Sequence, residues 1–569
     1  MHPEPRDPHP APATAPGPPT APGPPPVPAA QVAVVVIGYN DRAHVGEAVR
    51  SALAQGPAVA EVIAVDDCST DGSDGLLARL AAGEPRLRVV RRSVNSGGCG
   101  SPRNTGIDAA TAPYVMFLDS DDVLPPGAVD ALLTAATEAR AQLASGLCVR
   151  RELPSGREQP WQAPLYTAHT VLARPSQRPR LVHDTLCVNK LYRTGFLRDH
   201  GIRFPEGRFL YEDFVFTARV LAASPRIALV PDRVYVWQVR RSAGRLSLSL
   251  DRGRVENWTA RVEAGALAYD ILLGAGQKEL ARAARAKFLD HDVRMYAREL
   301  GLRDAHYQRA WWTRTRAYLA RYDAADWELN PAAPGRLLAR VVMASPEPCD
   351  LPRLRELAAR PARLLPPYAR TPEGDPVWSA DLPEVSLAPL LSRPVATLPL
   401  AVDADLHLRA RASLLRLRLH ELYGKVAEAG PPEVDVEWRA REGDRMRGRT
   451  TVALAPSGPD GWSAEVPVDP AGLGSGTWDL RLTLRFADGT RREVTAHALA
   501  GAGRLRRRAV PSVLHGVLLA QPYATHSGAL ALRVATGLHG VLAVVRGRLR
   551  RLLHRDTGRP TNRRGDGRT

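Results

Sequence analysis

The sequence predicts an α/β domain, then a helical connector, a C-terminal β-sandwich and a basic helical tail. Three observations lead to this prediction: β-branched runs alternate with helical stretches in the first half, a helical pattern follows, and apolar residues then recur with a period of two. At 569 residues, the chain is longer than one hydrophobic core usually organises. Hydrophobic residues make up 44% and charged residues 24%, as in typical globular proteins.

Shifts in pattern and composition divide the chain into six expected segments. They are a disordered Pro-rich arm at 1–30, the α/β domain at 31–250, a helical region at 251–345, a linker at 346–389, the β-sandwich at 390–500 and an Arg-rich tail at 501–569.

The α/β domain opens with QVAVVVIGYN (31–40), a β-branched run that predicts a strand buried on both faces. Further strands are expected in AEVIAVDD, LRVVRR and APYVMFLDSDD, with helices near 43–53, 74–82 and within 95–110 between them. Strands that alternate with helices at this spacing predict parallel βαβ units. Ligands of such sheets bind outside the carboxyl ends of the strands, where polar residues gather in this sequence.

The later elements are predicted from shorter patterns. NKLYRTGFL (189–197) and FLYEDFVFTARVLAA (209–223) are helix candidates, and ALVPDRVYVWQVRR (228–241) is a strand candidate. Alternating segments such as EVDVEWRARE and WSAEVPVD, separated by turn residues, favour a β-sandwich. Apolar and Arg-rich stretches at 512–555 predict an amphipathic basic helix.

The basic charge is concentrated in the tail. Residues 501–569 contain 14 Arg and two Asp but no Lys or Glu, so they supply +12 of the formal net charge of +17. Such a tail suits an acidic lipid surface or a polyanionic polymer, or it is simply a solvated segment. Because it lacks interleaved aromatic residues, no nucleic-acid partner is expected.

Cysteine usage and the apolar runs indicate where the protein works. Five widely spaced cysteines without a C-x-x-C pair favour a reducing compartment. The Pro-rich arm has no apolar core of a signal peptide, and no apolar run reaches the roughly 18 residues that span a bilayer. We therefore expect a cytoplasmic protein, attached at most peripherally to the inner face of the cell membrane.

Three carboxylates, those of Asp119, Asp121 and Asp122, crowd the end of the strand VMFLDSDDV. A bound divalent cation relieves their mutual repulsion most simply, and Mn²⁺ or Mg²⁺ held by one or two carboxylates plus phosphate oxygens fits a D-x-D. An Asx-turn with a capping Asp and a phosphatase-type nucleophile are the alternatives. Carboxylates and a tyrosine at the ends of two earlier strands disfavour the phosphatase.

Two further polar segments belong to the same strand ends. VDDCSTDGS places Asp66, Asp67 and Asp71 after the second strand, where they bind a ligand or form a turn that caps the next helix. NSGGCGSPRNTG follows the third strand and begins with Asn95. Its glycines allow a ligand to approach the backbone closely, and Arg103 supplies a planar, positively charged guanidinium group. Neither segment has the G-x-G-x-x-G spacing of a dinucleotide site.

Together these segments resemble family-2 glycosyltransferases, inverting enzymes of the GT-A fold that use nucleotide-sugar donors. VVVIGYN, VDDCSTDGS, NSGGCGSPRNTG, YVMFLDSDD, NKLY, YEDFVF and YVWQVRRSAGRLS occur in the family's order over roughly residues 32–250. The resemblance implies a nucleotide-sugar-binding, Rossmann-like GT-A domain. It assigns donor binding to several strand-end residues: Tyr39 and Asp67 contact the nucleotide base with Asp66 beside them, Asn95 lies in the donor loop, Arg103 lies near the base or the diphosphate, and Asp119 lies near the ribose. It assigns metal binding to Asp121 and Asp119.

The resemblance also implies a catalytic base in YEDFVF, with Asp213 at the matching position and Glu212 beside it. An inverting transfer needs one carboxylate to remove the proton of the acceptor hydroxyl while that oxygen attacks the anomeric carbon. Arg240 matches a basic position that grips the diphosphate. A helix-face carboxylate without catalytic function is the alternative for Asp213.

NKLYRTGFL together with FPEGRFLYEDFVFTARVLA resembles transferases that decorate teichoic acids or related wall polymers of Gram-positive bacteria, and QPYATHSGALALRV in the tail is similar to tails in actinobacterial members of that group. The Q-x-x-R-W signature of processive synthases is absent after Asp213, which favours transfer of one sugar to a preformed polymer or glycan. UDP-sugar is the expected donor, and a hexose or N-acetylhexosamine is the expected sugar. The β-sandwich and the tail are then expected to bind the polymer, to assemble a homo-oligomer or to hold the enzyme at the membrane. The alternative is that they only pack against the rest of the protein and bind no ligand. A noncatalytic scaffold for anionic polymers is the alternative function.

Overall fold

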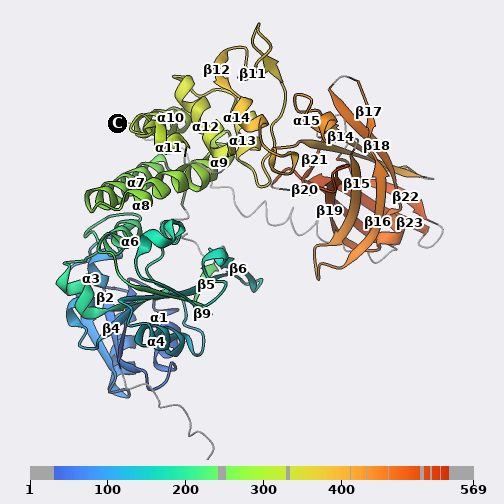
Figure 1. Cartoon of the computed structure of the whole chain (residues 1–569). Helices are drawn as coiled ribbons and strands as arrows, with labels where there is room; N and C mark the ends of the chain where they lie inside the picture. Colours follow the sequence, from blue (N-terminus) through green and yellow to red (C-terminus); the bar gives the residue numbers. More distant parts are fainter. Residues whose placement is uncertain are drawn as a thin grey trace, which may run out of the picture. The chain divides into compact units, whose positions relative to one another are not determined.

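The computed structural model describes residues 31–240, 251–328, 333–409, 412–430, 432–458, 460–499, 505–512, 516–525 and 527–536. The chain folds into two compact units, whose elements are labelled in Figure 1. The first unit comprises the residues up to 177 together with 186–208 and 223–242. The second comprises 178–185, 209–222 and the residues from 243 onward.

The first unit is built on a nine-stranded sheet with the order β3-β2-β1-β4-β8-β5-β9-β7, in which β6 pairs with β5. The strands are β1 (Val32–Gly38), β2 (Val59–Asp66), β3 (Leu87–Arg91), β4 (Tyr114–Asp119), β5 (Leu143–Leu153), β6 (Arg157–Trp161), β7 (Thr170–Leu172), β8 (Lys190–Arg193) and β9 (Ile227–Arg240). The helices are α1 (Val45–Leu53), α2 (Ser73–Ala82), α3 (Gly100–Ala109), α4 (Ala128–Glu138) and α5 (Thr194–Asp199), with short 3-10 turns η1 (Ala163–Leu165) and η2 (Pro175–Gln177).

Strands β1 to β4 are parallel, as the alternation of strands and helices predicts. The five residues 32–36 of β1 are at most 1% exposed, which accounts for the unbroken β-branched run. The register sets Gly38 beside Asp66 and Ile37 beside Asp119, so the carboxyl ends of the strands are level.

Two glycines of the segment NSGGCGSPRNTG allow α3 to pack closely. A Cβ atom on Gly106 would lie 2.2 Å from Cγ1 of Val35 in β1, and one on Gly100 would lie 1.9 Å from the carbonyl oxygen of Pro205. These two glycines therefore serve contacts within the protein itself.

The other half of the sheet is mixed. β8 runs antiparallel to both β4 and β5, whereas β5 and β9 are parallel. The helix expected at 189–197 is wrong in its first half, because Lys190–Arg193 forms β8 and the helix α5 begins at Thr194. The apolar run alone does not distinguish a short buried strand from a helix.

The second unit contains the helical region that the sequence predicts. Its helices are α6 (Glu212–Ala222), α7 (Val255–Gly274), α8 (Lys278–Lys287), α9 (Arg294–Leu300), α10 (Ala305–Leu319), α11 (Ala324–Glu328), α12 (Ala333–Ala344), α13 (Leu351–Ala358), α14 (Ala388–Leu391), α15 (Lys425–Glu428) and α16 (Pro470–Leu473). Shorter elements are the 3-10 turns η3 (Pro179–His183) and η5 (Val395–Thr397) and the π-helix η4 (Phe288–Val293). Trp258, Trp311 and Trp312 are fully buried in its core.

The described part of the second unit also holds three sheets. They are β10-β11-β12, the five-stranded β17-β18-β14-β13-β21, and the seven-stranded β16-β15-β19-β24-β23-β22 with β20 on β19. Their strands are β10 (Ala369–Arg370), β11 (Pro376–Ser379), β12 (Leu382–Ser386), β13 (Val402–His407), β14 (Ser413–His420), β15 (Glu433–Ala440), β16 (Met446–Ala453), β17 (Ala455–Pro456), β18 (Gly461–Val468), β19 (Gly476–Arg485), β20 (Arg491–Val494), β21 (Ala496–Ala498), β22 (Arg508–Ser512), β23 (Gly516–Ala524) and β24 (Leu530–Thr536).

Two expectations change in this region. The segment 346–389, expected as a linker, holds α13 and the sheet β10-β11-β12. The expected basic helix at 512–555 is wrong where the structure describes the tail, because β22, β23 and β24 complete the seven-stranded sheet there. The rest of that segment, like the arm at 1–30, lies outside the described residues. The other domain boundaries stay predictions.

All five cysteines lie among the described residues, and none of them forms a disulfide bond there. No helix within the described ranges is both long enough and apolar enough to cross a membrane.

Candidate functional site

Side chains from the parallel strands gather at the carboxyl edge of the first unit's sheet. Tyr39 follows β1, Asp66 and Asp67 lie at the end of β2, and Asp119 ends β4. This is the edge at which α/β sheets bind ligands. Tyr39 is 44% exposed, which leaves its ring accessible to a stacking partner.

Asp67 holds the start of the glycine-rich loop. Its Oδ2 accepts hydrogen bonds from Asn95 Nδ2 at 3.0 Å, from the Ser96 backbone N–H at 3.0 Å and from the Ser96 hydroxyl at 2.8 Å. Its Oδ1 lies 2.8 Å from Nε of Arg92. Because Asp67 is 3% exposed, its two oxygens serve this loop, and a contact to a nucleotide base stays a prediction.

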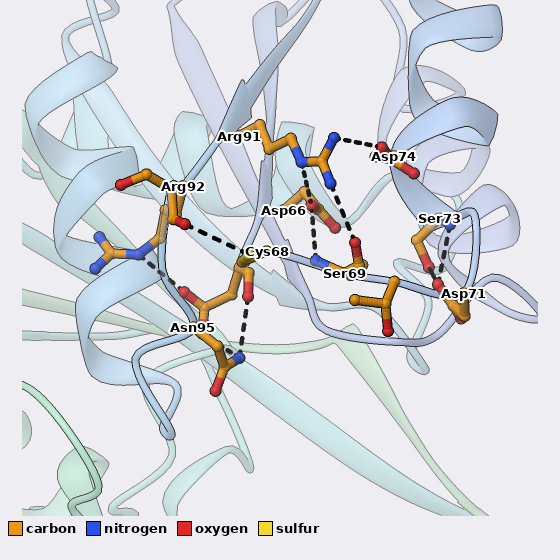
Figure 2. Close-up of polar contacts among 12 residues, drawn as sticks. Asp66, Cys68, Ser69, Asp71, Ser73, Asp74, Arg91, Arg92 and Asn95 are labelled. Atoms are coloured by element: carbon orange, nitrogen blue, oxygen red, sulfur yellow. Dashed lines mark hydrogen bonds and ion pairs between the residues drawn. The ribbon is translucent and has the colours of Figure 1, made fainter.

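Asp66 joins β2 to the following turn. Its Oδ2 accepts a hydrogen bond from the Ser69 N–H at 3.1 Å and lies 3.7 Å from Nε of Arg91. Arg91 Nη1 also lies 2.6 Å from Asp74 in the first turn of α2, as Figure 2 shows. Asp66 is 1% exposed, so it is a structural anchor of the strand end.

Asp71 forms the turn that precedes α2. Its Oδ1 accepts a hydrogen bond from the Ser73 N–H at 3.0 Å, and its Oδ2 accepts one from the Arg42 N–H at 2.9 Å. For this residue the turn alternative of the sequence is confirmed.

Arg103 and Asp119, two predicted site residues, form an ion pair. Arg103 Nη2 lies 2.6 Å from Asp119 Oδ1, and the guanidinium stands 5.3 Å from the centre of the Phe204 ring. Arg103 is 3% exposed, whereas the Asp119 side chain is 34% exposed. The arginine is therefore fixed inside the protein and presents Asp119 at the surface.

A group of carboxylates surrounds Asp121. Solvent reaches Asp121, yet the packing around its carboxyl group and the charges of Asp119 and Asp41 raise its pKa to about 6. Asp41 accepts a hydrogen bond from the Ser120 hydroxyl at 2.8 Å, which keeps it beside the D-x-D.

This carboxylate group fits a divalent cation. A cation would remove the repulsion that raises the pKa of Asp121, and Asp119 and Asp121 are the residues that would hold it. Among the described residues, no three His, Cys, Asp or Glu side chains form a metal cage. Mg²⁺ held by one or two carboxylates and substrate phosphates needs no such cage.

Asp122 connects the D-x-D segment to β9. It accepts hydrogen bonds from the Tyr235 hydroxyl and from the Gln238 backbone N–H, both at 2.7 Å, and the Asp119 N–H donates to the Tyr235 oxygen at 3.2 Å. Burial and then the charges of Asp121 and Asp119 raise the pKa of Asp122 well above its usual range. The sequence leaves the role of Asp122 open, with local capping as the default, and the structure shows instead that its carboxyl group bonds to a distant strand.

Arg240 also reaches the D-x-D segment from the end of β9. Its Nη1 donates a hydrogen bond to the backbone carbonyl of Asp121 at 2.8 Å, and its Nη2 donates one to Gln238 Oε1 at 3.2 Å. The part of YVWQVRRSAGRLS after Arg240 lies outside the described residues.

Glu212 and Asp213 occupy the first turn of α6 and are both half-buried. They belong to the second unit, whereas the strand-end residues belong to the first. Their action on a donor bound at the strand ends stays a prediction.

Sequence reasoning missed four residues of the strand-end region: Asp41, Arg91, Arg92 and Tyr235. Arg91 ends β3, Arg92 follows it, and Asp41 lies three residues after the end of β1, so the rule that selected Asp66 and Asp119 would also have found them. Tyr235 lies inside β9 and carries no such signal.

Comparisons with known proteins find similar sequences for the first part of the chain. Residues 33–201 match the Glycosyl transferase family 2 profile. Succinoglycan biosynthesis protein ExoO of Rhizobium meliloti is 31% identical over 231 residues, which are 39% of this chain and 64% of that protein. Poly(ribitol-phosphate) beta-N-acetylglucosaminyltransferase TarS of Staphylococcus aureus is 31% identical over 216 residues, 38% of this chain and 36% of the relative. The chain thus spans less than two thirds of the length of either relative.

The fold of this chain resembles the crystal structure of S. aureus TarS over most of its length. It aligns with a TM-score of 0.51 and 19% identity, and the alignment covers 89% of this chain and 85% of that chain. At this identity the likeness concerns the fold, and it confirms the expected GT-A-like α/β domain, helical middle region and C-terminal β-rich sheets. The motif order, the strand-end geometry and the profile match lead to one conclusion: residues 33–201 match glycosyltransferase family 2 and are similar in sequence to TarS and to an exopolysaccharide biosynthesis protein.

Proposed function

We propose that this protein transfers one sugar from a UDP-sugar to a hydroxyl group of a wall polymer or glycan, with inversion and with the help of a divalent cation. The observation that carries the proposal is the gathering of Tyr39, Arg103, Asp119 and Asp121 at one sheet edge of a family-2 domain. That edge offers an accessible ring, a buried arginine and a carboxylate group.

The donor binds through the strand ends in this proposal. The exposed ring of Tyr39 stacks on the base, and the loop that Asp67 and Asn95 hold together lies against the nucleoside. Asp119 binds the ribose, and Arg240 binds the diphosphate. The Arg103 ion pair keeps the Asp119 carboxyl group in one orientation, which favours binding because the site is organised in advance.

Mn²⁺ or Mg²⁺ at Asp119 and Asp121 would neutralise the charge of the departing nucleoside diphosphate. Asp121 must be ionised to take part, and its raised pKa therefore makes metal binding weaker below about pH 6. Asp122 contributes by holding the segment against β9 through Tyr235.

Asp213 acts as the general base. Its carboxylate removes the proton of the acceptor hydroxyl, and the resulting oxygen attacks the anomeric carbon on the face opposite the leaving diphosphate, so the configuration inverts. Glu212 stands beside it in the same helical turn. This assignment is supported by the position of YEDFVF in the family's order of motifs.

The names of the relatives support the class of acceptor. TarS is named for transfer of β-N-acetylglucosamine to poly(ribitol-phosphate), and ExoO for succinoglycan biosynthesis. We propose an N-acetylhexosamine or a hexose as the sugar and an anionic wall polymer or another glycan as the acceptor. The five widely spaced cysteines, without a C-x-x-C pair, support a reducing, cytoplasmic location, and the Arg-rich tail supports peripheral attachment to the inner membrane face. Assembly into a homo-oligomer through the C-terminal sheets is part of the same proposal.

Thermal unfolding with nucleotide-sugars tests the donor site directly. UDP-sugars with Mn²⁺ should raise the Tm of the full chain by mass action, and Asp121→Asn should remove the part of the shift that depends on Mn²⁺. Asp199→Asn, an exposed carboxylate at the end of α5, is the matched control and should leave the shift intact. A flat response to every UDP-, GDP- and ADP-sugar would contradict the proposal.

A further inference from the structure

A buried cluster of charges lies under the first turn of α6, which carries the proposed base. Arg261 of α7 donates two hydrogen bonds to Asp292 Oδ1, from Nε at 2.9 Å and from Nη2 at 2.6 Å. Lys287 Nζ, at the end of α8, lies 3.5 Å from Asp292 Oδ2. All three residues are less than 9% exposed, and together they carry two positive charges and one negative charge.

Aromatic rings connect this cluster to the residues on both sides of Glu212 and Asp213. The guanidinium of Arg261 stands 4.7 Å from the centre of the Tyr211 ring and 5.1 Å from that of Phe214. Lys287 Nζ stands 3.9 Å from the centre of the Phe214 ring. Such cation–π contacts are strongest where water is excluded, and both cations are buried here.

The backbone of this turn is fixed as well. Tyr211 adopts a left-handed conformation with φ of 62°, and its hydroxyl donates a hydrogen bond to Asn257 Oδ1 at 2.7 Å. The hydroxyl of Tyr296 donates to the same oxygen. A non-glycine residue holds this conformation only when its surroundings impose it. The entry into α6 is therefore set by contacts with α7 and α9.

The excess positive charge of the cluster needs a counter-charge. Burial lowers the pKa of Lys287, whereas the negative charges of Asp292 and Asp213 act in the opposite direction. Burial acts against ionisation of Asp292, but the charges of Arg261 and Lys287 outweigh it and lower the pKa of Asp292 to about 2. Asp292 thus stays charged and is the ion-pair partner of Lys287, whereas Phe214 carries the contact of Lys287 with the first turn of α6.

We propose that Lys287, held by Asp292 and in contact with the Phe214 ring, is a positioning residue that fixes the first turn of α6 and thereby places Asp213 for catalysis. This inference rests on the proposed function, because it assumes that Asp213 is the base. The charged and titratable groups of this cluster come from the elements packed together here: Arg261 on α7, Lys287 on α8, Asp292 and His291 on η4, and His183 on η3. A base held within a narrow range of orientations reacts faster, and a misplacement of about 1 Å costs on the order of a hundredfold in rate.

Steady-state kinetics of Lys287→Met test the role. We expect kcat to fall at least about tenfold, with KM for the UDP-sugar within twofold of wild type, because the donor residues belong to the other unit. Lys278→Met, the same change at the exposed start of α8, should leave both constants unchanged. An unchanged kcat in folded Lys287→Met, or an equal loss of donor affinity and kcat, would overturn the inference.

Phe214→Leu provides a second route if Lys287→Met does not fold. It removes the ring on which the ammonium rests without changing any charge, and it should also lower kcat while sparing KM. An unchanged kcat in folded Phe214→Leu would likewise overturn the inference.

A double-mutant cycle separates this inference from the proposed function. The unfolding constants of wild type, Lys287→Met, Asp213→Asn and the double variant report the coupling of the two residues without any turnover. We expect Asp213→Asn to change the unfolding constant by at least about threefold less in the Lys287→Met background than in wild type. An additive cycle would overturn the inference even if the protein transfers sugar. Absence of transfer by wild type together with a coupled cycle would instead contradict the proposed function and, with it, the catalytic role of Lys287.

Discussion

Single buried polar groups determine how the D-x-D segment is presented. The Tyr235 hydroxyl donates to Asp122 and accepts from the Asp119 N–H, so one oxygen atom contacts both ends of the turn that carries Asp121. Burial and then the charge of Asp122 raise the pKa of Tyr235 well above its usual range, so the hydroxyl keeps its proton and can donate it.

Tyr235→Phe should destabilise the protein by about 1–3 kcal/mol, because it leaves a buried carboxylate oxygen without its donor. Chemical denaturation of the full chain measures this change. Tyr39→Phe removes an exposed hydroxyl in the same way and should change the free energy of unfolding by less than about 0.5 kcal/mol. Equal effects of the two variants would refute the role given to Tyr235.

At the scale of elements, the close packing of α3 against β1 aligns the glycine-rich loop with the strand ends. The sequence predicts β1 to β4 and the residues at their ends, because parallel strands bring their carboxyl ends to one edge. It does not predict the pairs Asp67–Asn95 and Asp122–Tyr235, whose partners are 28 and 113 positions apart. Which residues lie at strand ends follows from the local sequence pattern. Which of them form hydrogen-bonded pairs depends on how distant segments pack in the tertiary structure.

Gly106→Ala should cost about 1–3 kcal/mol, because the new Cβ would lie 2.2 Å from Val35 and force α3 away from β1. Gly75→Ala provides the control within helix α2, where the nearest heavy atom is a flexible Arg79 nitrogen at 3.7 Å. That change should stabilise the protein by roughly 0.5–1 kcal/mol. Thermal or chemical unfolding shows whether each substitution lowers or raises the free energy of unfolding. An unchanged free energy of unfolding for Gly106→Ala would contradict the packing argument.

The whole molecule combines a first unit, which carries the proposed donor site, with a second unit, which carries the proposed base and the C-terminal sheets. The helical region was predictable from its long unbroken pattern. The β strands of the tail were not: β24, for example, is a short apolar stretch interrupted by Arg533, and a run of this length does not distinguish a strand from a helix.

Stability of the chain should depend on pH through two histidines of the second unit. Burial, more than any neighbouring charge, lowers the pKa of His183 to about 4 and that of His291 to about 3. Below the usual histidine pKa of 6.5 the unfolded chain binds protons that the folded chain does not. The free energy of unfolding should therefore fall as pH decreases from 6.5 toward 4.

The raised pKa of Asp121 acts in the opposite direction, so variants are needed to isolate the histidines. His183→Gln combined with His291→Gln should flatten the decline between pH 7 and 5, whereas His306→Gln, at an exposed position of α10, should retain it. Denaturant unfolding across this range measures the difference. The same decline in all three proteins would refute the assignment.

The most direct measurement is release of UDP from UDP-sugars by the full chain, with Mn²⁺ and a poly(ribitol-phosphate) or glycan acceptor. Wild type should turn over with inverted configuration in the product. Asp121→Asn and Asp213→Asn should each lose about a hundredfold or more in kcat, while Asp199→Asn retains the wild-type rate. Absence of turnover with every UDP-sugar, or full activity of Asp213→Asn, would contradict the account.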